Sequence, residues 1–219
     1  MRTPMISALA AAALVLGGCA STDPYTGEQK TSNATSGALI GAVSGALIGA
    51  ASSSKSDRGK GILIGAASGA AVGGGIGHYM DRQEAALREK LAGTGVSVKR
   101  DGDHIQLVMP NSLTFDVGSD RLKMPAINAL SGVAMVVSEF DETNLQITGH
   151  TDSTGGRDLN MRLSRERAEA VASELLRQSI SATRMSTYGA GPDRPIASNQ
   201  SEAGRAENRR VEIVLTPRT

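Results

Sequence analysis

The pattern of hydrophobic and polar positions changes several times along this chain of 219 residues. Its first apolar run, residues 6–16, follows one basic residue, Arg2, and leads into small residues before Cys19. A positive start, an apolar stretch of about 7–15 residues and a small-residue end are typical of a secretory signal. A helix that crosses a bilayer needs about 20 apolar residues, more than this run provides. We therefore predict a signal peptide at residues 1–18.

Glycine sets the pattern of residues 37–80, where it recurs at every fourth position in two runs separated by a polar break at 52–60. The glycines are Gly37, Gly41, Gly45 and Gly49, then Gly61, Gly65, Gly69, Gly73 and Gly77. Because a four-residue step keeps residues near one face of an α-helix, each run predicts a helix with a glycine stripe. An interior glycine costs a helix in water about 1 kcal/mol relative to alanine, whereas small residues let helices approach closely in lipid. We predict a membrane-associated helical hairpin.

Two alternatives for this glycine-rich segment stay open. A flexible tether of Gly, Ala and Ser has a similar composition. The length of the first run also argues against a helix that crosses a membrane, because residues 37–51 give only about 22 Å of helix and the hydrocarbon core is about 30 Å thick. The glycine stripes also suit self-association of several copies in a membrane.

Charged residues dominate 81–95, where Leu87 and Leu91 are spaced as on one helical face. We predict that this segment is a short surface helix that links the glycine-rich hairpin to a domain. Residues 96–219 have the mixed pattern of a globular domain. Alternating apolar positions predict strands at 96–100, 104–109, 145–150, 185–188 and 210–215, and helical spacing predicts helices at 122–140 and 163–178. This order predicts an α+β fold of βαβαββ type, with helices on one face of a mixed sheet.

Composition and charge argue against some classes of function. Removing residues 1–18 takes away one charge, Arg2, so the formal net charge falls from +1 to 0. With no basic excess, two phenylalanines, three tyrosines and no tryptophan, the chain lacks the electrostatic and stacking features of nucleic-acid-binding proteins. Cys19 is the only cysteine, which excludes an intramolecular disulfide.

The end of the signal resembles the bacterial lipobox. Residues 16–19, Leu-Gly-Gly-Cys, match its pattern, which implies that Cys19 is acylated on its thiol and becomes the mature N-terminus. Each buried CH₂ of an acyl chain contributes about 0.8 kcal/mol to membrane anchoring. Ala20 follows where lipoproteins kept in the inner membrane typically carry Asp, so the resemblance favours the outer membrane. Residues 19–36 would then form a lipidated tether.

Several motifs, separated along the last domain, together resemble those of a known family and occur in the same order. They are residues 148–155 (Thr-Gly-His-Thr-Asp-Ser-Thr-Gly), 188–192 (Tyr-Gly-Ala-Gly-Pro) and 204–213 (Gly-Arg-Ala-Glu-Asn-Arg-Arg-Val-Glu-Ile). Over residues 97–217 the chain resembles the OmpA C-terminal-domain family, and with the lipobox and glycine runs it resembles YiaD-type outer-membrane lipoproteins. The resemblance implies non-covalent binding of peptidoglycan, through the diaminopimelate of its stem peptide, by a domain in the periplasm.

The resemblance also implies a binding site. Diaminopimelate ends in a carbon that bears both an ammonium and a carboxylate, so its receptor needs an acid and a base close together. By motif, Asp152 matches the residue that pairs with the ammonium and Arg167 the residue that binds the carboxylate, while Asn160 and Arg209 match supporting residues. Arginine suits this role because its planar guanidinium donates two parallel hydrogen bonds. Spacing alone leaves other roles open: Asp152 and Arg167 pairing with each other, or Asp152 capping the helix.

An enzyme is the alternative from another class. His150, Asp152 and Ser164 offer the residue types of a hydrolase triad, and peptidoglycan is hydrolysable. However, the chain contains no G-x-S-x-G elbow, no H-E-x-x-H pair and no second cysteine for a zinc site. We therefore predict a binding protein without catalytic residues, metal or cofactor.

Overall fold

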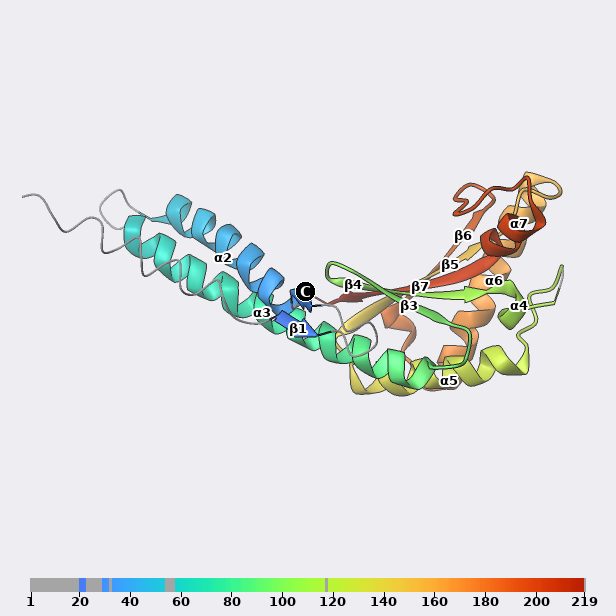
Figure 1. Ribbon diagram of the computed structural model, residues 1–219, viewed down its shortest axis with the longest axis horizontal. Coiled ribbons are helices and arrows are strands. Elements are labelled where there is room, and N and C mark those ends of the chain that lie inside the picture. Colours follow the sequence, from blue (N-terminus) through green and yellow to red (C-terminus); the bar gives the residue numbers. More distant parts are fainter. Residues whose placement is uncertain (1–19, 23–28, 32, 54–57, 117, 219) are drawn as a thin grey trace, which may run out of the picture. The chain divides into compact units, whose positions relative to one another are not determined.

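The computed structural model describes residues 20–22, 29–31, 33–53, 58–116 and 118–218, drawn in colour in Figure 1. The predicted signal peptide, 1–18, and Cys19 lie outside the described residues. The chain divides into two compact units, Met1–His78 and Tyr79–Thr219.

The first unit contains a helical hairpin and one small sheet. Strands β1 (Ala20–Thr22) and β2 (Gln29–Thr31) pair antiparallel. They precede helix α2 (Asn33–Ser52) and the first part of helix α3 (Arg58–Leu91). Of the helices in the described part of the chain, α3 is the one long and apolar enough to cross a membrane.

The glycine stripes of α2 and α3 face each other. A Cβ atom added at Gly45 would overlap the carbonyl oxygen of Gly65, and one added at Gly41 would overlap that of Gly69. The same holds for Gly49 and Gly61. The predicted glycine-zipper hairpin is therefore confirmed, and its helices approach so closely that any larger residue at these positions would clash.

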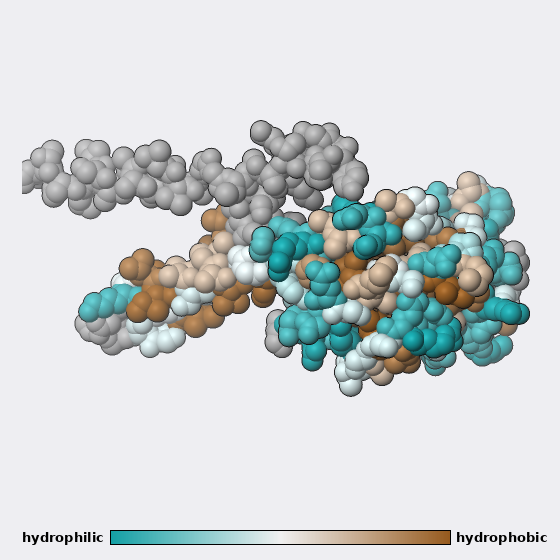
Figure 2. Space-filling model, turned by 90° about the horizontal axis from the view of Figure 1, so that it is seen from below, coloured by the Kyte–Doolittle hydropathy of each residue, from teal (hydrophilic) through white to brown (hydrophobic). Residues whose placement is uncertain are grey.

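Large apolar side chains of the hairpin point away from this contact. They are half or more exposed at Leu39, Ile40, Val43, Leu47, Ile48, Leu63, Ile64 and Val72. Figure 2 shows many of these side chains as brown, hydrophobic surface on the hairpin, interspersed with paler residues.

The second unit is a five-stranded mixed sheet in the order β3-β4-β7-β5-β6. Its strands are β3 (Ser97–Asp101), β4 (His104–Pro110), β5 (Thr143–His150), β6 (Met185–Gly191) and β7 (Arg210–Pro217). Strands β5 and β6 are parallel and the other neighbours are antiparallel. The predicted α+β class and mixed sheet are confirmed.

Alternation along the central strands builds the core. Leu107 of β4 lies opposite Ile213 of β7, which lies opposite Ile147 of β5, and all three side chains are fully buried. Helices α5 (Met124–Glu139) and α6 (Arg157–Arg177) cover this face, as Figure 1 shows. They bury apolar side chains at helical spacing: Leu130, Val133 and Val137 from α5, and Ala168, Val171 and Leu175 from α6.

Residues 81–95 differ from the predicted surface linker. Most of them form the last part of α3, which continues without a break from the glycine run, and their apolar side is buried within the second unit. Met80, Leu87 and Leu91 are at most 2% exposed, and Gln83 donates to the Thr143 hydroxyl (3.1 Å). The domain fold therefore includes this segment, because its leucines complete the core.

Three short helices complete the second unit: α4 (Asn111–Thr114), the 3₁₀ turn η1 (Ala182–Arg184) and α7 (Glu202–Asn208). Periodicity does not reveal elements of this length.

Candidate functional site

The site forms where β5 ends and α6 begins. At Gly149 a Cβ atom would overlap the carbonyl oxygen of Ser164, so α6 packs directly against the backbone of β5. The intervening loop turns at Gly155, whose φ of 88° suits glycine. This packing fixes the start of α6 beside the loop.

Asp152 is the centre of this loop and is 7% exposed. Its Oδ1 accepts a hydrogen bond from the Thr154 amide (2.8 Å), and its Oδ2 lies 2.6 Å from Nη1 of Arg209. Burial acts to raise the pKa of Asp152, but the hydrogen bonds from Arg209 and Thr154 outweigh it and the pKa is lowered. Asp152 is thus a carboxylate at neutral pH, held in one orientation.

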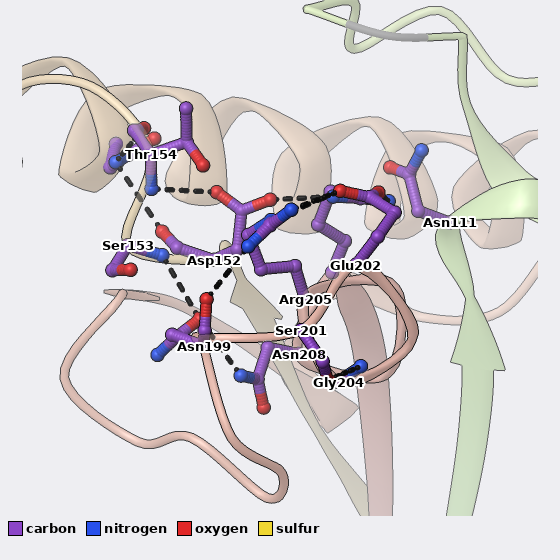
Figure 3. A network of polar contacts seen from close by, with 12 residues as sticks. Asn111, Asp152, Ser153, Thr154, Asn199, Ser201, Glu202, Gly204, Arg205 and Asn208 are labelled. Carbon is purple, nitrogen blue, oxygen red and sulfur yellow. Dashed lines mark hydrogen bonds and ion pairs between the residues drawn. The ribbon is translucent and has the colours of Figure 1, made fainter.

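Arg209 connects this carboxylate to α7. Its Nη2 lies 2.8 Å from Oε1 of Glu202, whose other oxygen accepts from Arg205 (2.7 Å). Hydrogen bonds to Glu202 and to Asp152 raise the pKa of Arg209. Ser201 caps the helix by accepting from the Gly204 amide (3.1 Å), as Figure 3 shows.

Two asparagines connect the loops around Asp152. Asn208 accepts from the amides of Ile196 (2.8 Å) and Ala197 (3.0 Å) and donates to Asn199 Oδ1 (2.9 Å). That same oxygen of Asn199 accepts from the Ser153 amide (3.2 Å), as drawn in Figure 3. The loop before α7 is therefore bonded to the loop that carries Asp152.

Asn160 lies on α6, because the helix begins at Arg157, six residues before the predicted start. It is 6% exposed, and its Nδ2 donates to the carbonyl oxygen of Thr154 (2.9 Å). Asn160 thus closes the loop onto the helix.

Arg167 is anchored through one edge of its guanidinium. Nε donates to the Ser119 carbonyl oxygen (3.0 Å), and Cζ lies 5.1 Å from the centre of the Phe115 ring. Burial and the nearby positive charge of Arg209 lower its pKa, and the carboxylates of Asp120 and Asp152 partly offset this. Within the described part of the chain, no carboxylate lies at ion-pair distance from Arg167.

The four predicted site residues therefore gather at one end of the sheet with different partners. Asp152, Asn160 and Arg209 share one hydrogen-bonded network, and Arg167 lies near it with no hydrogen bond from its η nitrogens to any residue that the structure describes. The expected alternative, an ion pair between Asp152 and Arg167, is not what the structure has, because Asp152 pairs with Arg209. Sequence reasoning missed Glu202, Asn199 and Asn208, and the GRAENRRVEI motif that contains Asn208 was the available signal.

The residue types of a hydrolase triad have separate partners. Ser164 Oγ donates to the Met161 carbonyl oxygen (2.9 Å) and accepts from the Gly191 amide (2.9 Å). His150 Nε2 lies 3.6 Å from Glu212 Oε2. In the portions of the chain that the structure describes, no group of three His, Cys, Asp or Glu side chains suits a metal ion.

Comparison with known proteins agrees with this architecture. The model of the OmpA family matches residues 114–209, and that of the YMGG-like Gly-zipper matches residues 1–81. The "Probable lipoprotein YiaD" of Escherichia coli (strain K12) is 56% identical over 216 residues, which cover 99% of this chain and 98% of that protein.

Two further proteins match a part of the chain. The "Peptidoglycan-binding protein ArfA" of Mycobacterium bovis is 41% identical over 86 residues, covering 39% of this chain and 26% of that protein. A structure described as the cell wall anchor of the T6SS from Pseudomonas aeruginosa has a TM-score of 0.55 at 27% identity, covering 60% of this chain and 96% of that one. The chain belongs to the YiaD-type family, in which a glycine-zipper segment precedes an OmpA-family domain.

Proposed function

We propose that this protein binds peptidoglycan non-covalently through the diaminopimelate of the stem peptide and so ties the outer membrane to the cell wall. The observation that carries the proposal is a fixed carboxylate, Asp152, near a guanidinium, Arg167, that has no carboxylate partner among the described residues. A ligand centre that bears both an ammonium and a carboxylate complements these two groups. Two similar proteins, described as a peptidoglycan-binding protein and a cell wall anchor, support the same function.

Each site residue has a distinct role in this proposal. The ligand ammonium takes the place of Arg209 at Asp152, while the ligand carboxylate accepts two hydrogen bonds from the η nitrogens of Arg167. Asn160 keeps the loop closed around the ligand, and Arg209 stays beside it through Glu202.

The membrane end of the proposed tether consists of Cys19, which lies outside the described residues, the segment that follows it, and the hairpin. Acylation at Cys19 holds the mature chain, and residues 19–36 act as a tether. Residues 37–80 sit in the membrane, where their exposed apolar side chains contact lipid. The glycine stripes of α2 and α3 contact each other, so the proposed hairpin uses them internally rather than for contacts between copies.

The protein acts without catalysis in this proposal. Ser164, the only nucleophile in the suggested triad, is bonded to backbone groups rather than to His150. Binding and release of the wall require only the charged groups of the site.

Co-sedimentation with purified cell-wall sacculi tests this function. The fragment should span residues 79–219, because a shorter one that begins after Leu91 would remove buried side chains of α3. We expect the parent to pellet, and Asp152→Ala and Arg167→Ala to lose at least about tenfold in affinity, since each removes charge-assisted bonds.

Arg162→Ala is the matched control, because Arg162 is an exposed cation on the same helix. It should pellet like the parent, with folding of all variants compared by circular dichroism. A folded parent that stays in solution would overturn the proposal.

A further inference from the structure

We infer that a second pocket, beside the proposed stem-peptide site, binds the sugar part of the same cell-wall polymer. This inference rests on the proposed function and extends it from the peptide to the glycan. The pocket lies at β5, the edge strand β6 and the first turns of α6, and its volume is about 430 Å³. Pockets that hold small ligands typically measure about 300–1,000 Å³.

The lining of this pocket, which we call the β6 pocket, combines a ring with neutral and charged hydrogen-bonding groups. The lining includes Gln146, Thr148, Met161, Tyr188, Asp193 and Arg194. Tyr188 is 53% exposed, more than any other aromatic side chain that the structure describes. An exposed ring presents an apolar face with a polar hydroxyl at its tip.

Thr148 of β5 adds a hydroxyl to the lining. The residue is 5% exposed and borders the pocket, and its hydroxyl can donate to or accept from a bound ligand. Gln146 adds an exposed amide and Arg194 an exposed guanidinium.

A sugar fits this combination of groups. A pyranose ring has one face of C–H groups, which can lie on the Tyr188 ring, and hydroxyl or acetamido groups around its edge. Gln146, Thr148 and Arg194 supply donors and acceptors for that edge. Asp193 is held by Arg157 (2.6 Å), so it contributes a fixed acceptor at the rim rather than a free charge.

The β6 pocket and the stem-peptide site lie on two sides of the same helical turn. Asn160 closes the loop of Asp152, and the next residue, Met161, lines the β6 pocket. Successive helical residues point about 100° apart, so the two side chains face different directions. The Thr151 amide also donates to the Gly191 carbonyl oxygen (2.9 Å), which ties the Asp152 loop to the end of β6. A disaccharide that carries a stem peptide therefore has neighbouring places for both parts.

Titration calorimetry with the full chain in detergent micelles tests this inference. The two probes are a diaminopimelate-containing stem tetrapeptide and the same tetrapeptide attached to its N-acetylglucosamine–N-acetylmuramic acid disaccharide. We expect the disaccharide to improve affinity about three- to tenfold, the size of an added aromatic contact. Tyr188→Ala should remove this improvement while binding the free tetrapeptide as the parent does, and Tyr188→Phe should retain most of it.

The outcomes separate this inference from the proposed function. If the parent binds both probes equally, or if Tyr188→Ala keeps the improvement, the glycan assignment is wrong while the stem-peptide site stands. If the parent binds neither probe, both proposals fall. Thr148→Val keeps the shape and removes the hydroxyl, so a loss of the improvement in this variant as well would support the pocket independently of Tyr188.

Discussion

At the scale of single residues, two arginines of the site, Arg167 and Arg209, have different environments that the sequence alone does not show. Arg209 is partly exposed and holds two carboxylates, whereas Arg167 is 3% exposed and is anchored by the Ser119 carbonyl oxygen and the Phe115 ring. Arg167 is anchored through its Nε and through contact with the Phe115 ring, so its η nitrogens remain available to a ligand. The two arginines therefore have different roles: Arg209 holds carboxylates of the protein, and Arg167 can bind a carboxylate of the ligand.

Replacing Arg167 with lysine tests whether guanidinium geometry matters beyond charge. The lysine ammonium is a point charge, so it cannot donate to the Ser119 carbonyl oxygen and at the same time form two parallel hydrogen bonds with a carboxylate. We expect Arg167→Lys to fold normally and to bind sacculi at least about tenfold more weakly. Arg162→Lys is the control. Parental binding by Arg167→Lys would show that positive charge alone suffices.

Glu212 should make the domain sensitive to acid. It lies 3.6 Å from His150 Nε2 and 2.6 Å from Arg210 Nε. The nearby His150 imidazole and the hydrogen bond from Arg210 outweigh the effect of burial and lower the pKa of Glu212 from 4.5 to about 2. Because the folded pKa is the lower one, this stabilisation is complete above about pH 4.5 and is lost as the pH falls toward 2.

Thermal melts of the parent and of Glu212→Gln between pH 6 and pH 2.5 check this dependence. The variant should be less stable at pH 6 by about 1–3 kcal/mol and should lose less stability on acidification. Two melting curves that fall in parallel with pH would contradict the assignment.

At the scale of secondary-structure elements, the position of α6 decides the geometry of the site. Three of its features serve the site: its first turn carries Asn160, its next turns carry Arg167, and Ser164 lies against Gly149 of β5. No side chain separates helix and strand at this point, so the placement is set by backbone contact.

Gly149→Ala should therefore affect both stability and binding. The new Cβ would overlap the Ser164 carbonyl oxygen, and forced overpacking of this kind costs about 1–3 kcal/mol. We expect a lower Tm and weaker pelleting with sacculi, because α6 must move away from the loop. Gly156→Ala is the matched control: its φ is −74° and no atom lies within 4 Å of an added Cβ. Equal stability of the two variants would argue against this role of Gly149.

Sequence patterns predicted most elements but not their contacts. Alternation located the central strands because their inner residues, such as Leu107 and Ile213, are fully buried. Helical spacing missed the start of α6, because residues 157–160 are mostly polar and their one large apolar side chain, Leu159, is exposed. The pair formed by Asp152 and Arg209 spans 57 residues, and only the strand order brings the two together. Motif resemblance named both residues without showing that they bind each other.

At the scale of the whole molecule, the chain combines an apolar hairpin with a charged domain. The hairpin exposes large apolar side chains, and α2 contains no charged residue. The domain carries the ion pairs of the proposed site. This separation along the chain is what a connection between a lipid phase and a hydrated polymer requires.

Cell fractionation of Cys19→Ser tests the membrane end. Several acyl chains contribute about 0.8 kcal/mol per CH₂ to anchoring, so we expect the parent in the outer-membrane fraction and the variant to leave it. Arg167→Ala keeps the lipid and should stay with the outer membrane despite weaker wall binding. An outer-membrane position for Cys19→Ser would assign anchoring to the hairpin instead.

The ion pair between Arg209 and Asp152 has a mechanical consequence for such a connection. Because Asp152 already holds a cation, an incoming ammonium exchanges with Arg209, and the net gain from that contact is smaller than it would be at an unpaired carboxylate. The same exchange runs backwards easily, with Arg209 returning as the ligand leaves. We expect each attachment to be short-lived and readily re-formed at a neighbouring stem peptide. A wall that is being enlarged could then slide beneath the membrane while it stays attached through other copies of the protein.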